Sequence, residues 1–287
     1  MDTKLTSLID SAWQTRVKFF PREIQFDYPH KTKALSLTGQ DCDLNCAHCG
    51  GHYLKQMQPA SREAGSTEKY NSYLVSGGCS KDGKLPLEQN KELIKHLRQQ
   101  GKINLHSGLV SSREAAMLPE ICDTVSFDMV GDDVTIQEVY GLNLSVSDLR
   151  ESYNNLRRHV KTLPHICIGL NGGEISGEYN ALDILSDDGA DGLVFLVFVP
   201  TRGTRLANNQ PPPLEEVGEL LARARNMFPT TAIHLGCMRP GGLYRKKLDC
   251  LAVKCGVNKI VLPVKAAVKT ASDLGLTIKN GEECCVL

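Results

Sequence analysis

Short apolar runs alternate with amphipathic segments over about 230 residues of the sequence, and this alternation constrains the fold more than any other feature. Residues 192–200 read GLVFLVFVP without polar alternation, which is typical of a strand covered on both faces in a parallel sheet. Strands that alternate with helices predict an α/β protein with a parallel sheet. The predicted strands are residues 33–39, 72–78, 103–108, 124–131, 165–172, 192–200, 231–238 and 258–264.

Helical patterns fill the intervals between these strands. Residues 87–101 place apolar side chains on one stripe and end at Gly101, which is a helix stop signal. Pro213 stands at a first-turn position before an amphipathic run. Eight strands can close into a (β/α)8 TIM-type barrel, whose usual length is about 250 residues. A partial (β/α)6 barrel is the alternative.

We expect a single domain over residues 1–287. It would carry an N-terminal helical extension, residues 1–32, and a C-terminal tail, residues 275–287. In a barrel the chemistry belongs at the mouth, the opening at the carboxyl ends of the strands. We expect the tail to fold back to this mouth.

Composition excludes several classes of protein. The chain has a formal net charge of zero, and its Lys and Arg residues are scattered, with the largest local run from Arg245 to Lys247. Binding of nucleic acid therefore has little electrostatic basis. No stretch approaches the ~18 apolar residues of a membrane span, and the first residues contain no signal-peptide core. We expect a cytoplasmic protein with no membrane association, in which the 11 cysteines are not paired as structural disulfides.

Three cysteines carry the chemistry. Cys42, Cys46 and Cys49 follow the first predicted strand with the spacing CxxxCxxC. Three thiolates on one tight loop can bind three irons of a cubane cluster and leave the fourth iron open. The alternatives are a structural zinc site and an electron-transfer cluster, both of which normally complete four protein ligands. No fourth ligand follows within the loop unless His48 or His52 serves.

CxxxCxxC on the loop after the first barrel strand resembles the signature of the radical S-adenosylmethionine (SAM) enzymes. The resemblance implies a 4Fe-4S cluster bound by Cys42, Cys46 and Cys49, with SAM on the open iron. An electron delivered to the cluster would cleave SAM, and the resulting 5'-deoxyadenosyl radical would abstract hydrogen from an unactivated carbon. The cofactor supplies this reactivity, and the protein holds and shields it.

Further segments resemble the SAM-binding segments of that family. The diglycine in VSGGCS matches the segment that contacts the SAM amino group, although this chain has Cys79 where the family usually has Glu. NGGEISGE and FVPTRGT are similar to the segments that pack against SAM and near its adenine, and the fourth strand would contact its ribose. The implied cofactor-binding residues are Gly77, Gly78, Ser126, Asp128, Gly173, Glu174, Val199 and Pro200.

Within the family the chain is most similar to the biotin synthase and lipoyl synthase branch. The suspected relative is one component of the two-subunit lipoyl synthase, a radical SAM sulfurtransferase that inserts sulfur into C–H bonds of a protein-bound octanoyl chain. The implied partners are an octanoylated lipoyl carrier protein or peptide, a second radical SAM subunit, and ferredoxin or flavodoxin as electron donor. The additional cysteine motif of single-chain lipoyl synthase does not precede Cys42 here.

Sulfur insertion would require an auxiliary Fe-S cluster. Barrel geometry places the cysteines that end the second and seventh strands near the mouth, and the tail is long enough to bring its vicinal pair there. Cys122, Cys167, Cys250 and Cys255 are predicted to be packing residues. The candidate auxiliary ligands are Cys237, Cys284, Cys285 and Cys79.

Three alternatives remain from the sequence. The ending CCVL matches a prenylation box, but no polybasic run precedes it. A one-cluster, biotin-synthase-like enzyme could catalyse a rearrangement or a step of cofactor biosynthesis, with the extra thiols used for packing. A non-catalytic scaffold could bind zinc at the three motif cysteines.

Overall fold

The computed structural model describes residues 3–63 and 69–287; Met1 and Asp2, which belong to the expected N-terminal extension, lie outside the described residues. The strands are β1 Glu23–Asp27, β2 Thr32–Ser36, β3 Gln58–Pro59, β4 Ser72–Ser76, β5 Lys102–His106, β6 Thr124–Asp128, β7 Thr162–Ile168, β8 Leu193–Val197, β9 Ile233–Leu235, β10 Lys259–Val261 and β11 Thr277–Gly281. The α-helices are α1 Thr3–Phe19, α2 Ala60–Glu63, α3 Lys91–Arg98, α4 Ser112–Met117, α5 Asp133–Thr135, α6 Val146–Arg157, α7 Glu178–Asp188, α8 Leu214–Met227, α9 Gly242–Lys254 and α10 Lys265–Asp273. The short helices are η1 His52–Gln56, η2 Leu118–Glu120 and η3 Ile136–Tyr140.

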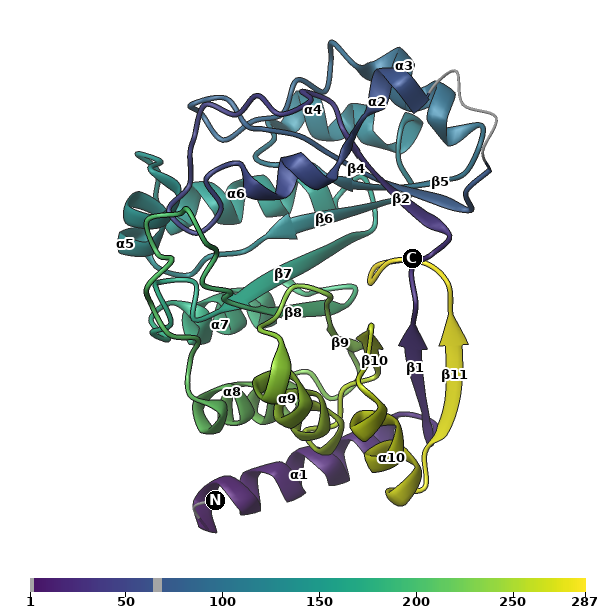
Figure 1. The fold of residues 1–287 in the computed structure, drawn as a ribbon, viewed down its shortest axis with the longest axis vertical. Helices are drawn as coiled ribbons and strands as arrows, with labels where there is room; N and C mark the ends of the chain where they lie inside the picture. Colours follow the sequence, from purple (N-terminus) through teal and green to yellow (C-terminus); the bar gives the residue numbers. More distant parts are fainter. Residues whose placement is uncertain (1–2, 64–68) are drawn as a thin grey trace.

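The strands form one curled, entirely parallel sheet with helices on its outer side (Figure 1). The strand order is β11-β1-β10-β9-β8-β7-β6-β5-β4-β2-β3. All eight predicted strands are present, as β2 and β4 to β10. They lie side by side in chain order, and the α/β class with a TIM-barrel-like arrangement is confirmed.

The sheet is a half-barrel, because its hydrogen bonds do not close it into a (β/α)8 ring. Among the described strands, β10 pairs with β9 and β1, and no pairing joins β10 to β2. β1 takes the edge of β10 that closure would require, and β11 pairs with the other edge of β1. Because only residues 28–31 separate β1 from β2, the chain itself spans the seam.

Residues 1–32, expected to be a helical extension, contain both a helix and a strand. α1 packs on the outside against α8 and α9, with Leu5, Ile9 and Ala12 buried. β1 then alternates: Ile24 and Phe26 are buried on the helical side, while Gln25 and Asp27 face the concave side and bond to each other. The EIQFD stretch is short and polar, so its pattern alone did not identify it as a strand.

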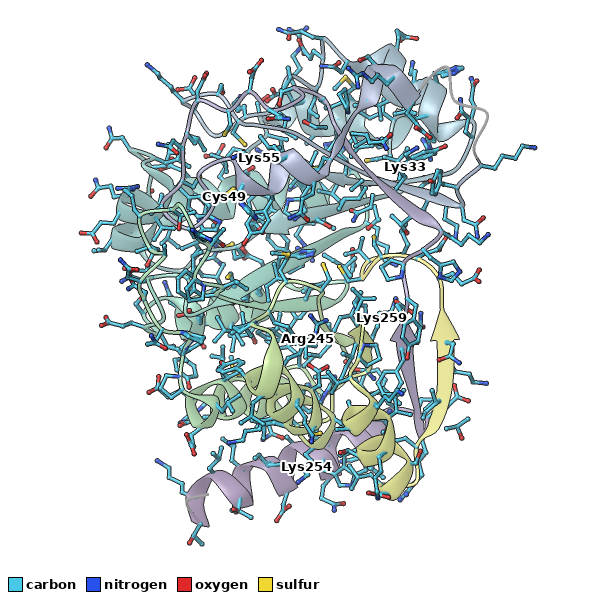
Figure 2. All side chains as sticks on the ribbon, in the orientation of Figure 1. Lys33, Cys49, Lys55, Arg245, Lys254 and Lys259 are labelled. Atoms are coloured by element: carbon cyan, nitrogen blue, oxygen red, sulfur yellow. The ribbon has the colours of Figure 1, made fainter. Side chains whose placement is uncertain are left out.

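The helices pack their apolar faces on the sheet as the sequence predicts. α8 buries Val217, Leu220 and Leu221, whereas Met227 at its last turn is 37% exposed. The side chains from the concave face fill a lumen, which we define as the space inside the curl of the sheet (Figure 2). None of the described helices combines the length and the apolar character needed to cross a membrane.

Candidate functional site

The three motif cysteines lie on one loop at the carboxyl end of β2. We call residues 37–51 the thiol loop. Its turns are closed by its own backbone: Cys49 N donates to Cys46 O at 3.1 Å, and His52 N donates to Cys49 O at 2.8 Å. Asn45 adopts a left-handed conformation with a φ of 50°, which Asn tolerates better than most residues. All three thiols are partly exposed to solvent, so they are accessible to a ligand.

Neighbouring thiols act on the ionisation of Cys46. Burial, followed by the charges of Cys49, Cys42 and Cys79, raises the pKa of Cys46 to about 12. Thiolates bind iron and zinc in the deprotonated form, and a cationic centre offsets their mutual repulsion. Three neighbouring thiols on one loop therefore fit an iron-sulfur cluster chemically. Among the described residues, no three His, Cys, Asp or Glu side chains are arranged around a single metal ion.

A buried histidine beside the thiol loop has an unused polar atom. His48 packs edge-on against Tyr140 at 5.5 Å between ring centroids, and its Nδ1 has no hydrogen-bond partner. Burial lowers the pKa of His48, so the ring is neutral. An unpartnered polar atom in this position is expected to bind a group that is present only in the loaded protein.

Gly78 determines how closely the thiol loop approaches β4. A Cβ atom on Gly78 would lie 1.9 Å from Asp41 O and 2.6 Å from Cys42 Cα, so only glycine fits. Gly78 N also donates to Thr38 Oγ1 at 2.7 Å. Gly77 is less confined, because its nearest neighbour would be the Thr38 hydroxyl at 3.2 Å. A groove of about 460 Å³ opens beside Cys42 and Gly78 and is lined farther out by Lys84 and Glu114.

The fourth predicted strand, now β6, places its two candidate residues in different environments. Ser126 is 1% exposed, and its hydroxyl donates to Asn104 Oδ1 at 2.9 Å. Asp128 lies at the carboxyl end of β6 with its side chain 45% exposed, 3.9 Å from His106 Nε2. Asp128 also acts electrostatically on His48 and Cys79. The carboxylate of Asp128 therefore faces the site, while Ser126 is occupied below it.

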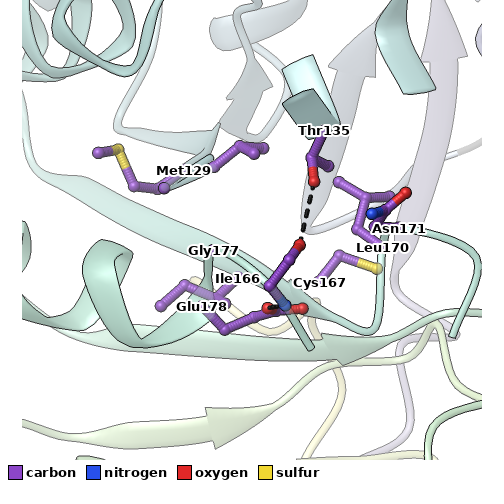
Figure 3. A pocket seen from close by; sticks show the side chains of 11 residues that line it. Met129, Thr135, Ile166, Cys167, Leu170, Asn171, Gly177 and Glu178 are labelled. Atoms are coloured by element: carbon purple, nitrogen blue, oxygen red, sulfur yellow. Dashed lines mark hydrogen bonds between the residues drawn. The ribbon is translucent and has the colours of Figure 1, made fainter. Parts of the chain in front are cut away.

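The glycine-rich segment after β7 folds into a compact turn. Gly173 has a φ of 100°, and a Cβ there would lie 2.0 Å from Gln210 O, whereas Glu174 is exposed. Figure 3 shows a small cavity of about 20 Å³ between this turn and the end of β6, where Thr135 and Ser176 bond through their hydroxyls at 3.2 Å.

Glu178 is a residue that the sequence reasoning quoted without assigning to the site. It is buried, and it accepts from Gly169 N at 2.6 Å and from Ser176 N at 2.9 Å, so its carboxylate fixes the shape of this turn. The only sign of its role in the sequence is its position inside the glycine-rich segment NGGEISGE. Burial raises its pKa.

The loop after β8 packs on the thiol loop. Val199 and Pro200 are half-buried, and Val199 O accepts from the Thr201 hydroxyl at 3.1 Å. The same hydroxyl meets Tyr53 Oη at 3.0 Å, and Leu206 N donates to Ala47 O at 3.2 Å. The segments after β4, β7 and β8 thus converge around the carboxyl ends of the strands that flank the thiol loop.

The vicinal cysteines lie in the lumen. Five tail residues form β11, and the terminal segment, which we define as residues 282–287, then turns inward (Figure 1). Cys284 Sγ accepts from Asn104 Nδ2 of β5 at 3.2 Å, and Cys285 Sγ is 3.7 Å from His165 Nε2 of β7. His234 of β9 donates through Nδ1 to Cys285 O at 2.7 Å. Because these contacts come from strands spread across the sheet, the segment occupies the interior beneath the mouth.

An ion pair inside the lumen holds the terminal segment. Lys259 Nζ lies 3.0 Å from Asp27 Oδ2 as a close ion pair without an aligned hydrogen bond, and it donates to Leu287 O at 3.0 Å. Lys259 and Asp27 are 6% and 1% exposed. Val286 packs against apolar side chains near the starts of β7 and β8, Leu163 and Val194. The sequence reasoning missed Lys259, because a single lysine in a short strand gives no signal of its partner.

The candidate auxiliary ligands divide into two groups. Cys237 is exposed, and its ionisation is coupled to that of Cys284, as is that of Cys285. A hydrogen bond from the Cys285 thiol lowers the pKa of Cys284 to about 7. Cys79 instead lies at the thiol loop, where its carbonyl accepts from Asp43 N at 2.9 Å and the Cys42 thiol points at the same oxygen at 3.9 Å.

The remaining cysteines are packed into the protein to different degrees. Cys122 and Cys255 are buried, and burial raises the pKa of each to about 12. Cys250 is half-buried on α9. Cys167 borders the cavity of Figure 3.

The sequence matches no known family model and no curated protein. Solved structures resemble the fold. Methylornithine synthase (PylB) superposes over 97% of this chain and 90% of its own with a TM-score of 0.70 and 13% identity. The FeFe-hydrogenase maturase HydG from Carboxydothermus hydrogenoformans superposes over 97% of this chain and 73% of its own with a TM-score of 0.69 and 16% identity. HMG-CoA lyase from Brucella melitensis reaches 0.52 at 10% identity, over 87% of this chain and 92% of its own. This fold therefore accommodates several activities, and chemistry has to be argued from the residues of the site.

Proposed function

We propose that this chain is a radical SAM enzyme. The observation that carries the proposal is the thiol loop: three partly exposed cysteines in CxxxCxxC spacing at the carboxyl end of β2 in a TIM-barrel-like sheet. Active sites of such barrels lie at this end of the strands. Three thiolates supplied by one loop suit a cluster that keeps one iron open for a cofactor.

In this proposal Cys42, Cys46 and Cys49 hold a 4Fe-4S cluster with SAM beside it. When bound, the pair supplies the means to abstract hydrogen from an unactivated carbon. The protein contributes position: Gly78 keeps Cys42 close to β4, and the loop after β8 covers Ala47. Asp128, which is 45% exposed, and the unpartnered Nδ1 of His48 are the proposed partners for the polar groups of SAM. Gly77, Gly173, Glu174, Val199 and Pro200 remain the proposed further contacts to SAM, and Ser126 would act through Asn104.

We further propose that the reaction is sulfur insertion into a protein-bound octanoyl chain, as in a lipoyl synthase component. A second cluster would be held by Cys284 and Cys285 in the lumen and by the exposed Cys237, which acts electrostatically on Cys285. His165 is a better fourth donor than Cys79. Its Nδ1 donates to Leu163 O at 3.0 Å, so Nε2 is unprotonated and directs its lone pair toward Cys285. The proposed partners are the octanoylated carrier, a second radical SAM subunit, and ferredoxin or flavodoxin.

A one-cluster enzyme that catalyses a rearrangement or a cofactor-assembly step is the second candidate. The packing of the terminal segment favours it, because Cys285 and Val286 are buried against apolar side chains of the sheet. Two of the proteins with a similar fold are a methylornithine synthase and an FeFe-hydrogenase maturase. In this case the vicinal cysteines would be structural.

Iron counting after anaerobic reconstitution with iron and sulfide separates the candidates. For sulfur insertion we expect about eight irons per chain, falling to about four in a C42A/C46A/C49A variant and to about four in C284A/C285A. Cys250→Ala, a half-buried cysteine on α9, is the matched control and should change nothing. Four irons in the parent that vanish in the triple variant would leave the one-cluster enzyme. Full iron in the triple variant, or no SAM cleavage under reductant by the reconstituted parent, would reject the radical SAM proposal.

A further inference from the structure

Cationic side chains follow three neighbouring strands at the mouth, and at one end of this set Arg205 Nη2 donates to Glu138 O, beyond β6, at 3.2 Å. Residues 198–213, 236–248 and 262–272 follow the neighbouring strands β8, β9 and β10, and they contain no acidic residue. Arg239 and Lys269 in these segments are already paired with Asp249 and Asp273. The other six cations have no carboxylate partner among the residues that the structure describes. We define them as the basic rim: Arg202, Arg205, Arg245, Lys246, Lys247 and Lys265.

The topology places the basic rim at the same end of the sheet as the thiol loop. A helix that connects two parallel strands begins where the first strand ends, so the first turns of α9 and α10 lie at the mouth. Arg245 is in the first turn of α9, and Lys265 is the first residue of α10. Arg245 Nη2 donates to Leu262 O at 2.9 Å and so joins the start of α9 to the end of β10. The first acidic residues after segment 198–213 are Glu215 and Glu216, at the start of α8.

Exposed apolar side chains accompany the basic rim. Leu243 is 66% exposed and Leu262 is 44% exposed. Leu262 has a left-handed backbone with a φ of 51°, which is unusual for leucine. Its carbonyl accepts from both Arg239 and Arg245, and its N donates to Asp27 O at 2.7 Å. The surroundings hold Leu262 in this conformation at the mouth, and such imposed strain is found mainly at functional positions.

We infer that the basic rim, with Leu243 and Leu262, is the docking surface for an acidic protein domain that delivers the acyl substrate to the mouth. This inference rests on the proposed function, which requires a substrate attached to a protein. Unpaired cations steer an acidic partner and select against basic ones. The two leucines provide apolar anchors inside the charged surface, as protein interfaces use. Nucleic acid is less suited, because the large exposed apolar side chains here are leucines and not aromatic rings that could stack on bases.

Binding of an octanoylated, acidic lipoyl domain to the full chain tests the inference. We expect K246Q/K247Q to weaken binding about tenfold at low salt and to flatten the salt dependence, since two steering charges are lost. Lys254→Gln is the matched control, because Lys254 is exposed on the same helix but at its opposite end (Figure 2). Leu262→Asn tests the apolar anchor: Asn tolerates the left-handed backbone, so binding should weaken while the melting temperature does not fall.

The outcomes are decisive in either direction. Equal loss of affinity in the Lys254 control, or no binding by the parent chain, would overturn the docking surface. Tighter binding of a short DNA duplex than of the acidic domain, with the same dependence on Lys246 and Lys247, would show a nucleic-acid surface instead. The experiment requires no cluster, so it is repeated with C42A/C46A/C49A. If the parent chain binds the acidic domain but holds no iron and cleaves no SAM, the proposed function is rejected and the docking surface stands. If the parent chain holds iron and cleaves SAM but does not bind the domain, the docking surface is rejected and the radical SAM function stands.

Discussion

Adding one methyl group at Gly78 should displace the thiol loop and remove the cluster that we propose there. The Cβ of Gly78→Ala would lie 1.9 Å from Asp41 O. A carbon and a carbonyl oxygen approach to about 3.3 Å, so the backbone around Cys42 would have to move by about 1.4 Å. Overpacking of this kind costs about 1–3 kcal/mol, and a shift of this size exceeds what metal ligands tolerate. We expect iron per reconstituted chain to fall at least to half.

Gly77→Ala is the matched control for this prediction. Its Cβ would meet only side-chain atoms, Thr38 Oγ1 at 3.2 Å and Leu85 Cδ2 at 3.4 Å, so a shift of a few tenths of an ångström accommodates it. We expect Gly77→Ala to keep its iron and to lose less than about 1 kcal/mol of stability. Iron content is measured by colorimetry on protein whose circular dichroism matches the parent, and stability by urea unfolding of the apo chain. A Gly78→Ala protein that retains full iron, or equal losses in both variants, would refute the role of Gly78.

Two further predictions concern stability. Lys259→Met should lower the free energy of unfolding by about 3–5 kcal/mol, because it leaves the Asp27 carboxylate buried without its partner and removes the hydrogen bond to Leu287 O. Urea unfolding measures this loss, and faster alkylation of Cys284 and Cys285 reports the release of the terminal segment. Adding Asp27→Asn to the same chain should recover part of the lost stability. The bidentate bond from Arg150 holds the pKa of Asp188 below its usual value, so this pair contributes stability at neutral pH that is lost as the pH falls below about 4. Asp188→Asn should show a weaker acid dependence of its urea midpoint, and an unchanged slope would contradict the assignment.

The alternation of short apolar, β-branched runs with helical segments predicted the eight strands of the curled sheet. β1 and β11 were missed because their residues alternate with polar ones and each is five residues long. What identifies them is the pairing of β1 with β10 and with β11, and a pairing such as that of Glu23 with Thr277, from opposite ends of the chain, leaves no local pattern. The same two strands leave the ring open and bring the terminal segment into the lumen.

The candidate site was predictable where its residues are close in the sequence. CxxxCxxC is such a case, since spacing alone places the three thiols on one loop. The neighbours of Cys284 and Cys285 were not predictable, because Asn104, His165 and His234 come from three strands and meet only when the sheet curls. Cys79, predicted as an auxiliary ligand, lies at the end of β4 against the thiol loop, which makes it a weaker candidate than Cys237, Cys284 and Cys285.

The run from Arg245 to Lys247 shows how position changes the meaning of a sequence feature. In a chain of net charge zero this run predicts a solvated helix face. In the fold it begins in the first turn of α9, which contains no acidic residue, and Lys265 opens α10. Cations there oppose the helix dipole at a cost of about 0.3–1 kcal/mol each. Acidic residues at these positions would stabilise both helices. Because the chain carries cations there instead, at the mouth that holds the thiol loop, a role in binding explains them better than helix stability does.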